Sequence, residues 1–312
     1  MRANRAVYGE TLARLADTDE KIVVVDADLM AVVGYGAFQE RHGDRLFEVG
    51  IAEQNMVGVA AGLATCGLTA FTASFAVFTA TRALDQVRNM VCYNNLNVKV
   101  IGTHAGIETG QDGGTHMSVE DVAVMRALPN MRVVAPSTPL MTEKLTEAIA
   151  AEYGPFYMRF GREKSAELYQ EGEEFPIGSS KLLRPGRDVA LIAYGHMVEL
   201  ALEAAGQLEK DGIDARVIDM YSLKPADEEA IKTAARETGA IVTCEDHSVI
   251  GGLGELVAGV TAACVPCIVR RFGVSDRFGR SGPWKDVYEW AGFTPEKIAQ
   301  TAKEAISAKN AG

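Results

Sequence analysis

A carboxylate at the entrance of an apolar segment is the first feature of this sequence that could do chemistry. Glu53, Gln54 and Asn55 stand together in FEVGIAEQNMVGVAAGLA, directly before a stretch that carries no charge. That stretch is rich in Gly and Ala and predicts a buried, closely packed helix over 53–66. A first-turn acid stabilised by the helix dipole is the ordinary explanation of Glu53. The apolar flanks instead favour a buried acid with a specific partner, such as a protonatable ring nitrogen of a ligand.

A glycine-rich loop supplies the second candidate group. GTHAGIETGQDGGTHMSVED, over 102–121, holds His104, Asp112 and His116 between Gly-containing turns. Its glycines would let a ligand approach the backbone, and its side chains suit proton transfer and hydroxyl recognition. As a metal site it is poor, because it has neither H-x-x-x-H nor a tight carboxylate spacing. We therefore predict no metal ligands in this chain.

Two phenylalanines form the third element. Phe75 and Phe78 are three residues apart in SFAVF, where a predicted strand passes into a helix, and they share one helical face. Core packing is the usual role of such a pair. A wall for a flat heterocycle is the alternative.

Length, composition and charge bound the class of protein. The chain has 312 residues, of which 47% are hydrophobic and 23% charged, which is typical of a globular protein of about two domains. A net charge of −11 argues against nucleic acid or an anionic membrane as partner. The sequence shows no run of about 20 apolar residues and no signal-peptide core in MRANRAVYGE, so we expect a cytoplasmic protein.

The five cysteines do not predict a disulfide framework, because they are few and odd in number. Cys264 and Cys267 form CVPC, which has redox or metal spacing. No second pair completes a zinc site, so packed thiols are favoured.

Short β-branched runs alternate with helical patterns along the chain. Buried strands are expected over 21–28, 69–75, 98–105, 132–136 and 156–161. Helices are expected over 53–66, 79–95, 118–128 and 137–152, with Ser118 and Ser137 as N-caps of the last two. The strands are continuously apolar rather than alternating, which is typical of a parallel sheet covered on both faces.

A polar segment containing EGEEFPIGSS then interrupts this rhythm and predicts a linker. Strand and helix patterns resume with DVALIAYG and continue to CIVRRFGV. The fold class is therefore α/β, with two doubly wound domains of mainly parallel sheets. We place the domains at 1–165 and 187–312 and the linker at 166–186. Ligands of such sheets bind beyond the carboxyl ends of the strands, where most of the unusual polar residues fall.

These elements together resemble the pyrimidine-binding domain of a transketolase-type thiamine diphosphate enzyme. GIAEQNMVGVAAGLA, the Phe-x-x-Phe corner and THAGIETGQDGGTHMSVEDVAVMRALPNMRVVAP carry the resemblance. DVALIAYG, VIDMYSLKP and EDHSVIGGLGE are similar to the family's C-terminal domain, so the resemblance covers essentially the whole chain. It implies a transferase that moves a two-carbon ketol unit from a ketose, phosphorylated or otherwise acidic, to an aldose.

The resemblance implies a role for each cofactor-facing residue. Glu53 matches the glutamate that bonds N1′ of the aminopyrimidine and favours the imino tautomer, whose N4′ removes the thiazolium C2 proton. Phe78, with Phe75, would stack on the pyrimidine ring. Gln54, beside Asn55, would help to order the loop at the cofactor.

Substrate-facing positions follow in the same way. His104 and His116 match the histidines that handle proton transfer and donor hydroxyls, and Asp112 matches the acid that reads a hydroxyl configuration. Arg5 and Arg159 match the pair of guanidinium groups that binds a sugar phosphate. Asp28 matches the acid near the substrate channel.

One stretch departs from the family pattern. After Asp28 the usual polar residues, including a phosphate-contacting hydroxyl, are replaced by LMAVVGYGAF. Val32 cannot donate a hydrogen bond from its side chain. The sequence therefore does not identify the sugar substrate, and sulfonated and branched-chain sugars are among the candidates.

The family holds the cofactor's diphosphate through Mg²⁺ in a domain with a G-D-G motif followed by Asn. No such motif occurs here, and the residues before Arg5 leave no room for that domain. The chain is therefore expected to be the C-terminal subunit of a split enzyme. Its partner would be an N-terminal, diphosphate-binding subunit of about 270–300 residues that ligates most of the Mg²⁺, in an α₂β₂ assembly.

Other functions remain as alternatives. Deoxyxylulose-phosphate synthases and the β subunits of 2-oxoacid dehydrogenases carry related halves, although D-G-G-T-H fits the transketolase and synthase loops better than the dehydrogenase loop. A catalytically silent scaffold subunit is the non-enzyme alternative, against which the retained Glu53, His104, Asp112 and His116 argue. A nucleotide-binding Rossmann protein is disfavoured because G-x-G-x-x-G is absent after the first strand.

Overall fold

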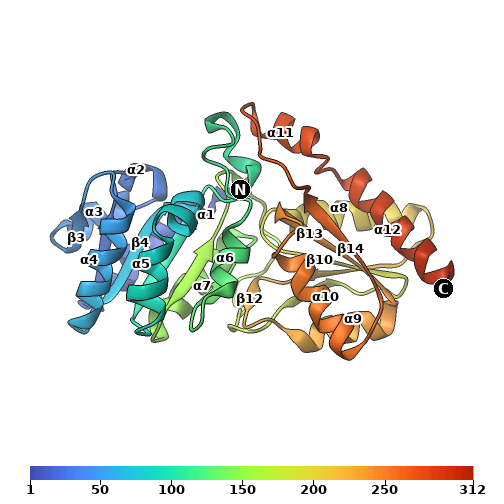
Figure 1. Ribbon diagram of the computed structural model, residues 1–312, viewed down its shortest axis with the longest axis horizontal. Helices are drawn as coiled ribbons and strands as arrows, with labels where there is room; N and C mark the ends of the chain where they lie inside the picture. Colours follow the sequence, from blue (N-terminus) through green and yellow to red (C-terminus); the bar gives the residue numbers. More distant parts are fainter. Residues whose placement is uncertain (312) are drawn as a thin grey trace. The chain divides into compact units, whose positions relative to one another are not determined.

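The computed structural model describes residues 1–311, which form two compact units (Figure 1). The first unit comprises residues 1–105 and 124–177, and the second comprises residues 106–123 together with the chain from Gly178 onward. Both are α/β with mainly parallel sheets, which confirms the expected fold class. The loop that carries Asp112 and His116 belongs to the second unit, a division that the sequence pattern does not reveal.

The sheet of the first unit is parallel, in the order β6-β7-β5-β4-β2-β3. Its strands are β2 (Ile22–Asp26), β3 (Leu46–Glu48), β4 (Thr69–Phe75), β5 (Val98–Thr103), β6 (Arg132–Val134) and β7 (Phe156–Arg159). Every residue of β2, β4, β5 and β7 is buried, as their apolar sequences require. A separate two-stranded ribbon pairs β1 (Arg2–Ala3) with β8 (Lys164–Ser165).

Helices pack against this sheet. They are α1 (Asn4–Ala16), α2 (Met30–Val33), α3 (Gly36–His42), α4 (Glu53–Thr65), α5 (Leu84–Gln86) and α7 (Pro139–Ala151). In Figure 1, α4 and α5 lie in front of the sheet. A short helix, α6 (Asp121–Ala127), follows the loop that carries His116.

The helix expected over 79–95 is present in a different form, and both expected N-caps are wrong. The helix expected over 79–95 is largely π-helical, with turns η2 (Phe78–Arg82) and η3 (Val87–Cys92) on either side of α5. The N-cap of α7 is Thr138, whose hydroxyl accepts from the Met141 N–H, rather than Ser137. Ser118 does not start a helix either, because its carbonyl bonds the Gly106 N–H and α6 begins three residues later.

The second unit has a five-stranded sheet in the order β14-β13-β10-β11-β9. Its strands are β9 (Lys181–Arg184), β10 (Val189–Ala193), β11 (Ala215–Asp219), β13 (Ala240–Ser248) and β14 (Ile268–Val274). All are parallel except β9, which runs antiparallel to β11. Part of the expected linker is therefore an edge strand. It bonds a neighbour on one side only, so it lacks the apolar run of a central strand.

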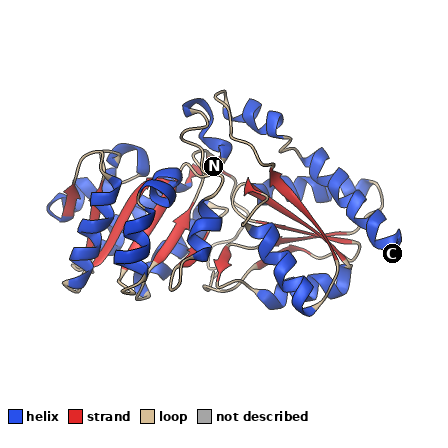
Figure 2. Cartoon of the chain, in the orientation of Figure 1, coloured by secondary structure: helices blue, strands red, loops and turns tan. Residues whose placement is uncertain are grey.

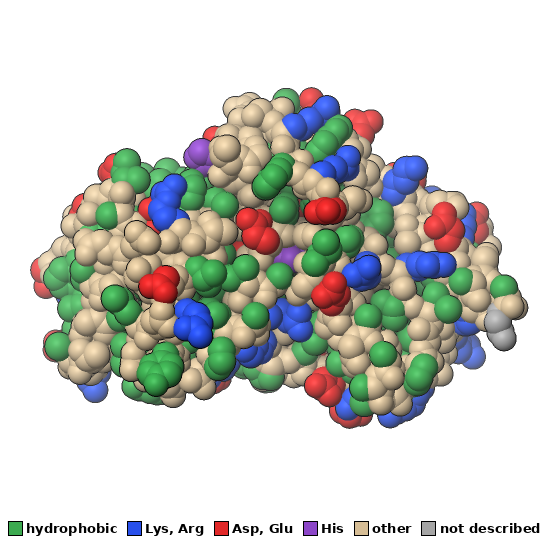
Figure 3. Space-filling model, in the orientation of Figure 1, with side chains coloured by type: hydrophobic (Ala, Val, Ile, Leu, Met, Phe, Trp, Pro, Cys, Tyr) green, Lys and Arg blue, Asp and Glu red, His purple; other side chains and the backbone are tan. Residues whose placement is uncertain are grey.

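Helices accompany this second sheet as well (Figure 2). They are α8 (Met197–Lys210), α9 (Glu228–Thr238), α10 (Leu253–Cys264), α11 (Trp284–Ala291) and α12 (Pro295–Ala311), and a short strand, β12 (Ser222–Lys224), precedes α9. Within residues 1–311, no helix combines the length and apolar character that a membrane span requires. On the face drawn in Figure 3, acidic and basic side chains are interspersed.

Candidate active site

Glu53 is the first residue of α4, and its side chain is only 2% exposed. Its partner is Arg82, whose Nη1 lies 2.9 Å from both carboxylate oxygens. Gln54 and Asn55 are exposed to solvent, in contrast to their neighbour. The sequence therefore predicts the burial of Glu53 and misses its counter-ion.

Arg82 also covers an aromatic ring. Its guanidinium carbon lies 4.3 Å from the centroid of Phe78. Phe78 is in turn parallel to Phe75, with an interplanar angle of 7° and centroids 5.9 Å apart. A flat cation that donates N–H groups thus lies on Phe78 while it bonds Glu53. A flat nitrogen heterocycle would find the same two contacts here, a ring face and a carboxylate.

His104 stands directly beyond β5 and stacks on Phe75, with centroids 4.0 Å apart. It is 2% exposed and has a φ of +54°, which is uncommon for a residue with a side chain. Its Nε2 lies 3.2 Å from Arg5 Nη1, and its Nδ1 lies 3.0 Å from the Thr103 hydroxyl. Because a guanidinium only donates, Nε2 accepts from Arg5 and the ring proton resides on Nδ1.

Arg5 comes from the first turn of α1 and also donates to the Val32 carbonyl at 3.3 Å. Burial lowers the pKa of Arg5, and so does the neighbouring positive charge of Arg162. Arg162 is therefore a second cation of this region, and no motif in the sequence marks it. Its only sequence signal is its position three residues after Arg159.

Arg159 is buried at the carboxyl end of β7, paired in register with Gly102 of β5. Since His104 follows the same end of β5, both residues belong to the carboxyl edge of the sheet. Phe75 ends the next strand, β4, at that edge. The structure thus brings Arg5, Phe75 and His104 into contact, at the edge where open α/β sheets bind ligands.

Asp28 is exposed in the turn after β2, with a φ of +62°. Its N–H donates to Glu48 Oε1 at 2.9 Å, and the same oxygen accepts from the Gly50 N–H at 2.7 Å. Glu48, at the end of β3, therefore ties the Asp28 turn to the segment that leads into Glu53. This role of Glu48 is not evident from its type or position in the sequence.

Asp26 is buried beside Glu48 at the end of the neighbouring strand. Its Oδ2 accepts from the N–H groups of Leu29 and Met30, each at 2.9 Å. Burial, and a hydrogen bond with the Glu48 carboxyl group, raise the pKa of Asp26 to about 7. Asp26 therefore holds its proton below that pH.

The raised pKa of Asp26 predicts a pH effect on stability. The folded pKa of Asp26 lies above its unfolded value of 3.8, so the native state binds the extra proton and its contribution is lost as pH rises toward about 7. Asp26→Asn keeps an oxygen for Leu29 and Met30 and supplies a permanent N–H donor to Glu48. We expect the variant to gain stability relative to the wild type between pH about 5 and about 8, measured by urea unfolding. An equal loss of stability at both pH values would contradict a raised pKa of Asp26 in the folded state.

Asp112 and His116 lie on the loop of the second unit. Asp112 is exposed and His116 is half-buried. The His116 N–H donates to the Gly113 carbonyl at 2.9 Å, and its Nδ1 lies 3.0 Å from the Thr115 hydroxyl. Both side chains are therefore held on a turn of defined shape.

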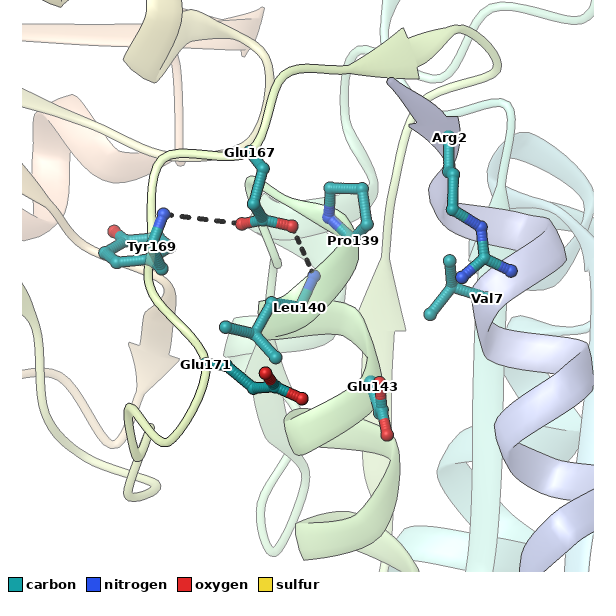
Figure 4. Close-up of a pocket in the computed structure, with 8 residues that line it drawn as sticks. All are labelled: Arg2, Val7, Pro139, Leu140, Glu143, Glu167, Tyr169 and Glu171. Atoms are coloured by element: carbon teal, nitrogen blue, oxygen red, sulfur yellow. Dashed lines mark hydrogen bonds between the residues drawn. The ribbon is translucent and has the colours of Figure 1, made fainter.

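A surface pocket of about 280 Å³ lies elsewhere in the first unit (Figure 4). Its lining includes Glu143, Glu167 and Glu171 and the single cation Arg2. Glu167 accepts from the N–H groups of Leu140 and Tyr169, so its carboxylate joins two backbone segments of the pocket wall. An acidic lining of this kind repels a phosphate or sulfonate group, which makes the pocket unsuitable for an acidic sugar.

No group of three or more His, Cys, Asp or Glu side chains within residues 1–311 is arranged to hold a metal ion. Cys264 is exposed at the end of α10, and Cys267 is half-buried just before β14. Both are free thiols. Burial raises the pKa of the Cys267 thiol, which disfavours the reactive thiolate.

Comparison with known families places both parts of the chain in one family. Residues 1–166 match the family described as transketolase, pyrimidine binding domain. Residues 178–298 match the family described as transketolase, C-terminal domain. Together the two matches cover most of the chain.

Two relatives and one solved structure match over nearly their whole length. The chain is 43% identical to a putative transketolase C-terminal section of Methanocaldococcus jannaschii, covering 97% of this chain and 96% of that protein. It is 42% identical to a 6-deoxy-6-sulfo-D-fructose transketolase subunit of Clostridium sp. (strain MSTE9), covering 98% and 95%. Among solved structures, one described as a split gene transketolase, inactive beta4 tetramer, matches with a TM-score of 0.93 and 44% identity, covering 99% and 100%.

Proposed function

This chain belongs to the transketolase family, and on that premise we propose that it is the C-terminal subunit of a split transketolase, active only with an N-terminal subunit. The observation that carries the proposal is the pairing of buried Glu53 with a flat cation stacked on Phe78. A silent scaffold has no use for a desolvated acid beside an aromatic ring that is covered only by a side chain able to move aside. The transketolase family implies dependence on thiamine diphosphate.

The residues of the first unit fit the aminopyrimidine of that cofactor. Phe78 offers a ring face, and Glu53 offers a desolvated carboxylate that can accept a hydrogen bond from a ring nitrogen. The guanidinium of Arg82 holds both contacts here and would have to move aside. When bound, thiamine diphosphate supplies the carbon nucleophile that cleaves the bond beside a ketose carbonyl. Mg²⁺ would be ligated mainly by the partner.

The other site residues fit an acidic sugar. His104 Nε2 accepts from Arg5 here and would become available to take a proton from a sugar hydroxyl once Arg5 turns to the anionic group of the substrate. His116 and Asp112 would contact further hydroxyls. Arg5 and Arg159 would bind the anionic end of the substrate, with Arg162 nearby. The Val32 carbonyl already accepts from Arg5, so this stretch supplies an acceptor where the family has a donor. The Clostridium relative is named for a sulfonated ketose, which supports an acidic ketose as the substrate class.

An exposed apolar surface of the first unit supports a partner subunit. Ile51, just before α4, is 76% exposed, and Tyr93, just after η3, is 83% exposed. Met90, in η3, is also exposed, and a Cβ on Gly58 of α4 would lie 3.7 Å from its sulfur. Exposed apolar side chains around the helix that begins with Glu53 are suited to burial against another chain. We place the N-terminal subunit there, in an α₂β₂ assembly.

Reconstitution tests this function. The chain is co-expressed with the diphosphate-binding subunit of its own host, and ketol transfer is measured over a panel of acidic ketoses and aldoses with thiamine diphosphate and Mg²⁺. We expect activity from the complex and none from either subunit alone. A stable complex that binds neither thiamine diphosphate by calorimetry nor any ketose would reject the proposal.

Arg159 gives a sharper test of substrate class. Arg159→Lys keeps the charge and the aliphatic stem but loses the planar fork, so KM for an acidic ketose should rise about tenfold with kcat little changed. KM for the matching sugar without an anionic group should not rise. Arg187→Lys, an exposed arginine of the second unit, is the matched control. An equal KM change for acidic and neutral sugars would remove Arg159 from anion binding.

A further inference from the structure

We propose that Asp246 and Tyr288 of the second unit act as a clamp on residues 106–118, here called the substrate loop. The inference rests on the proposed function, because it assigns substrate contacts to Asp112 and His116 of this loop. It gives the C-terminal domain a part in the reaction, as the element that positions these residues. Neither Asp246 nor Tyr288 is a catalytic residue in this proposal.

The clamp is a set of short hydrogen bonds. Asp246, in β13, is 7% exposed, and its two oxygens lie 2.9 and 3.2 Å from the Ile107 N–H. The Tyr288 hydroxyl, from α11, donates to Asp246 Oδ2 at 2.8 Å. Tyr288 is itself buried, so this charge-assisted network lies away from water.

The start of the substrate loop is shaped to fit the clamp. Gly106 has a φ of +74°, and a Cβ at this position would lie 2.1 Å from Asp246 Oδ2. Only glycine allows this close approach of backbone to carboxylate. The Gly106 N–H also bonds the Ser118 carbonyl at 2.8 Å, which closes the base of the loop.

The far end of the loop is tied to the same strand. The Ser248 N–H, at the end of β13, donates to the Val119 carbonyl at 2.7 Å. His247 lies next to Ser248, and its Nε2 accepts from the Ala123 N–H at 3.3 Å. Both ends of the loop are therefore fixed by β13, with Asp112 and His116 between them.

The middle of the loop packs on the segment that leads into α11. A Cβ on Gly110 would lie 3.3 Å from Trp284 Cβ, and one on Gly114 would lie 2.6 Å from the Gly279 carbonyl oxygen. Trp284 stacks edge-on against His196, whose Nδ1 lies 3.8 Å from the buried Glu108 of the loop. The loop is therefore packed against other residues of the second unit along its length.

Clamping and cofactor binding involve different units. The contacts available to an aminopyrimidine are Glu53 and Phe78 of the first unit, whereas the clamp and the loop it holds belong to the second. Loosening the clamp should therefore make the positions of Asp112 and His116 less well defined and leave the affinity for the cofactor unchanged. A purely structural role would instead lower stability and affect both ligands alike.

The test uses Tyr288→Phe in the reconstituted complex. Losing one hydrogen bond to a carboxylate should lower kcat/KM for the ketose about tenfold and speed amide hydrogen exchange in 106–118 to a similar degree. The Kd for thiamine diphosphate should stay within about twofold of the wild-type value. Asp246→Asn, which retains an acceptor for Ile107, should be milder than Asp246→Ala.

Lys303→Ala is the matched control, because it removes the Lys303–Asp211 ion pair elsewhere in the second unit. It should leave exchange and kinetics unchanged. Wild-type exchange and kcat/KM in Tyr288→Phe would overturn the clamp, and so would an equal loss of cofactor and ketose affinity. If the wild-type complex has no ketol transfer, the proposed function fails, and hydrogen exchange in 106–118 still decides whether the clamp exists.

Discussion

A complex that carries Glu53→Gln should bind thiamine diphosphate and lose at least about a hundredfold in kcat for ketol transfer. The substitution keeps the size of the side chain and removes only its ability to be a carboxylate. An amide cannot stabilise a protonated ring nitrogen as a desolvated anion does, so proton transfer at the cofactor loses its driving group. Steady-state kinetics on the reconstituted complex measure the effect.

Glu203→Gln serves as the control, because this glutamate is exposed on α8 of the second unit. It should retain wild-type kcat. Circular dichroism of Glu53→Gln should match that of the wild type, since Arg82 is half-exposed and can turn to solvent when its partner is neutral. Near-normal turnover in Glu53→Gln would show that Glu53 has no part in activating the cofactor.

Gly9→Val should destabilise the isolated chain by more than about 3 kcal/mol or prevent it from folding. A Cβ at Gly9 of α1 would lie 1.6 Å from the Gly34 carbonyl oxygen. Gly34 cannot retreat easily, because it has a φ of +103° and its own Cβ position is 2.1 Å from the Arg5 carbonyl oxygen. The clash is between two backbones, which relax far less than a side chain does. Urea unfolding measures the loss.

Gly206→Ala is the matched control for this prediction. Gly206 lies inside α8 with open space around its Cβ position, so the variant should gain about 0.5–1 kcal/mol. A Gly9→Val protein as stable as the wild type would mean that α1 does not lie against Gly34. Because Arg5 is one turn before Gly9, the same contact positions the guanidinium that bonds His104.

The buried strands of the fold were predictable because their signal is local. β4 coincides with the expected 69–75, and α4 begins at Glu53 as expected. α1 was not predicted, because NRAVYGETLARLA mixes charges and a glycine into its apolar face. That helix is stabilised by packing on α7 and α3. These helices are distant from α1 in the sequence, so a short stretch of sequence does not reveal the contacts.

The candidate site shows the same limit. Burial of Glu53 could be inferred from its neighbours in the chain, whereas its pairing with Arg82 depends on the π-helical turn over Phe78–Arg82, which has no clear sequence signature. The bond between Asp246 and Ile107 joins residues 139 positions apart. Such long-range contacts follow from how the loop of 106–123 joins the second unit, and residue types alone do not encode them.

In the proposed function, cofactor binding at this site replaces the Arg82 side chain. A heterocycle that takes over the face of Phe78 and the carboxylate of Glu53 must first displace a resident cation that satisfies both. The measured affinity would then be the difference between the binding free energies of two occupants, and without the cofactor the buried Glu53 carboxylate keeps a counter-ion.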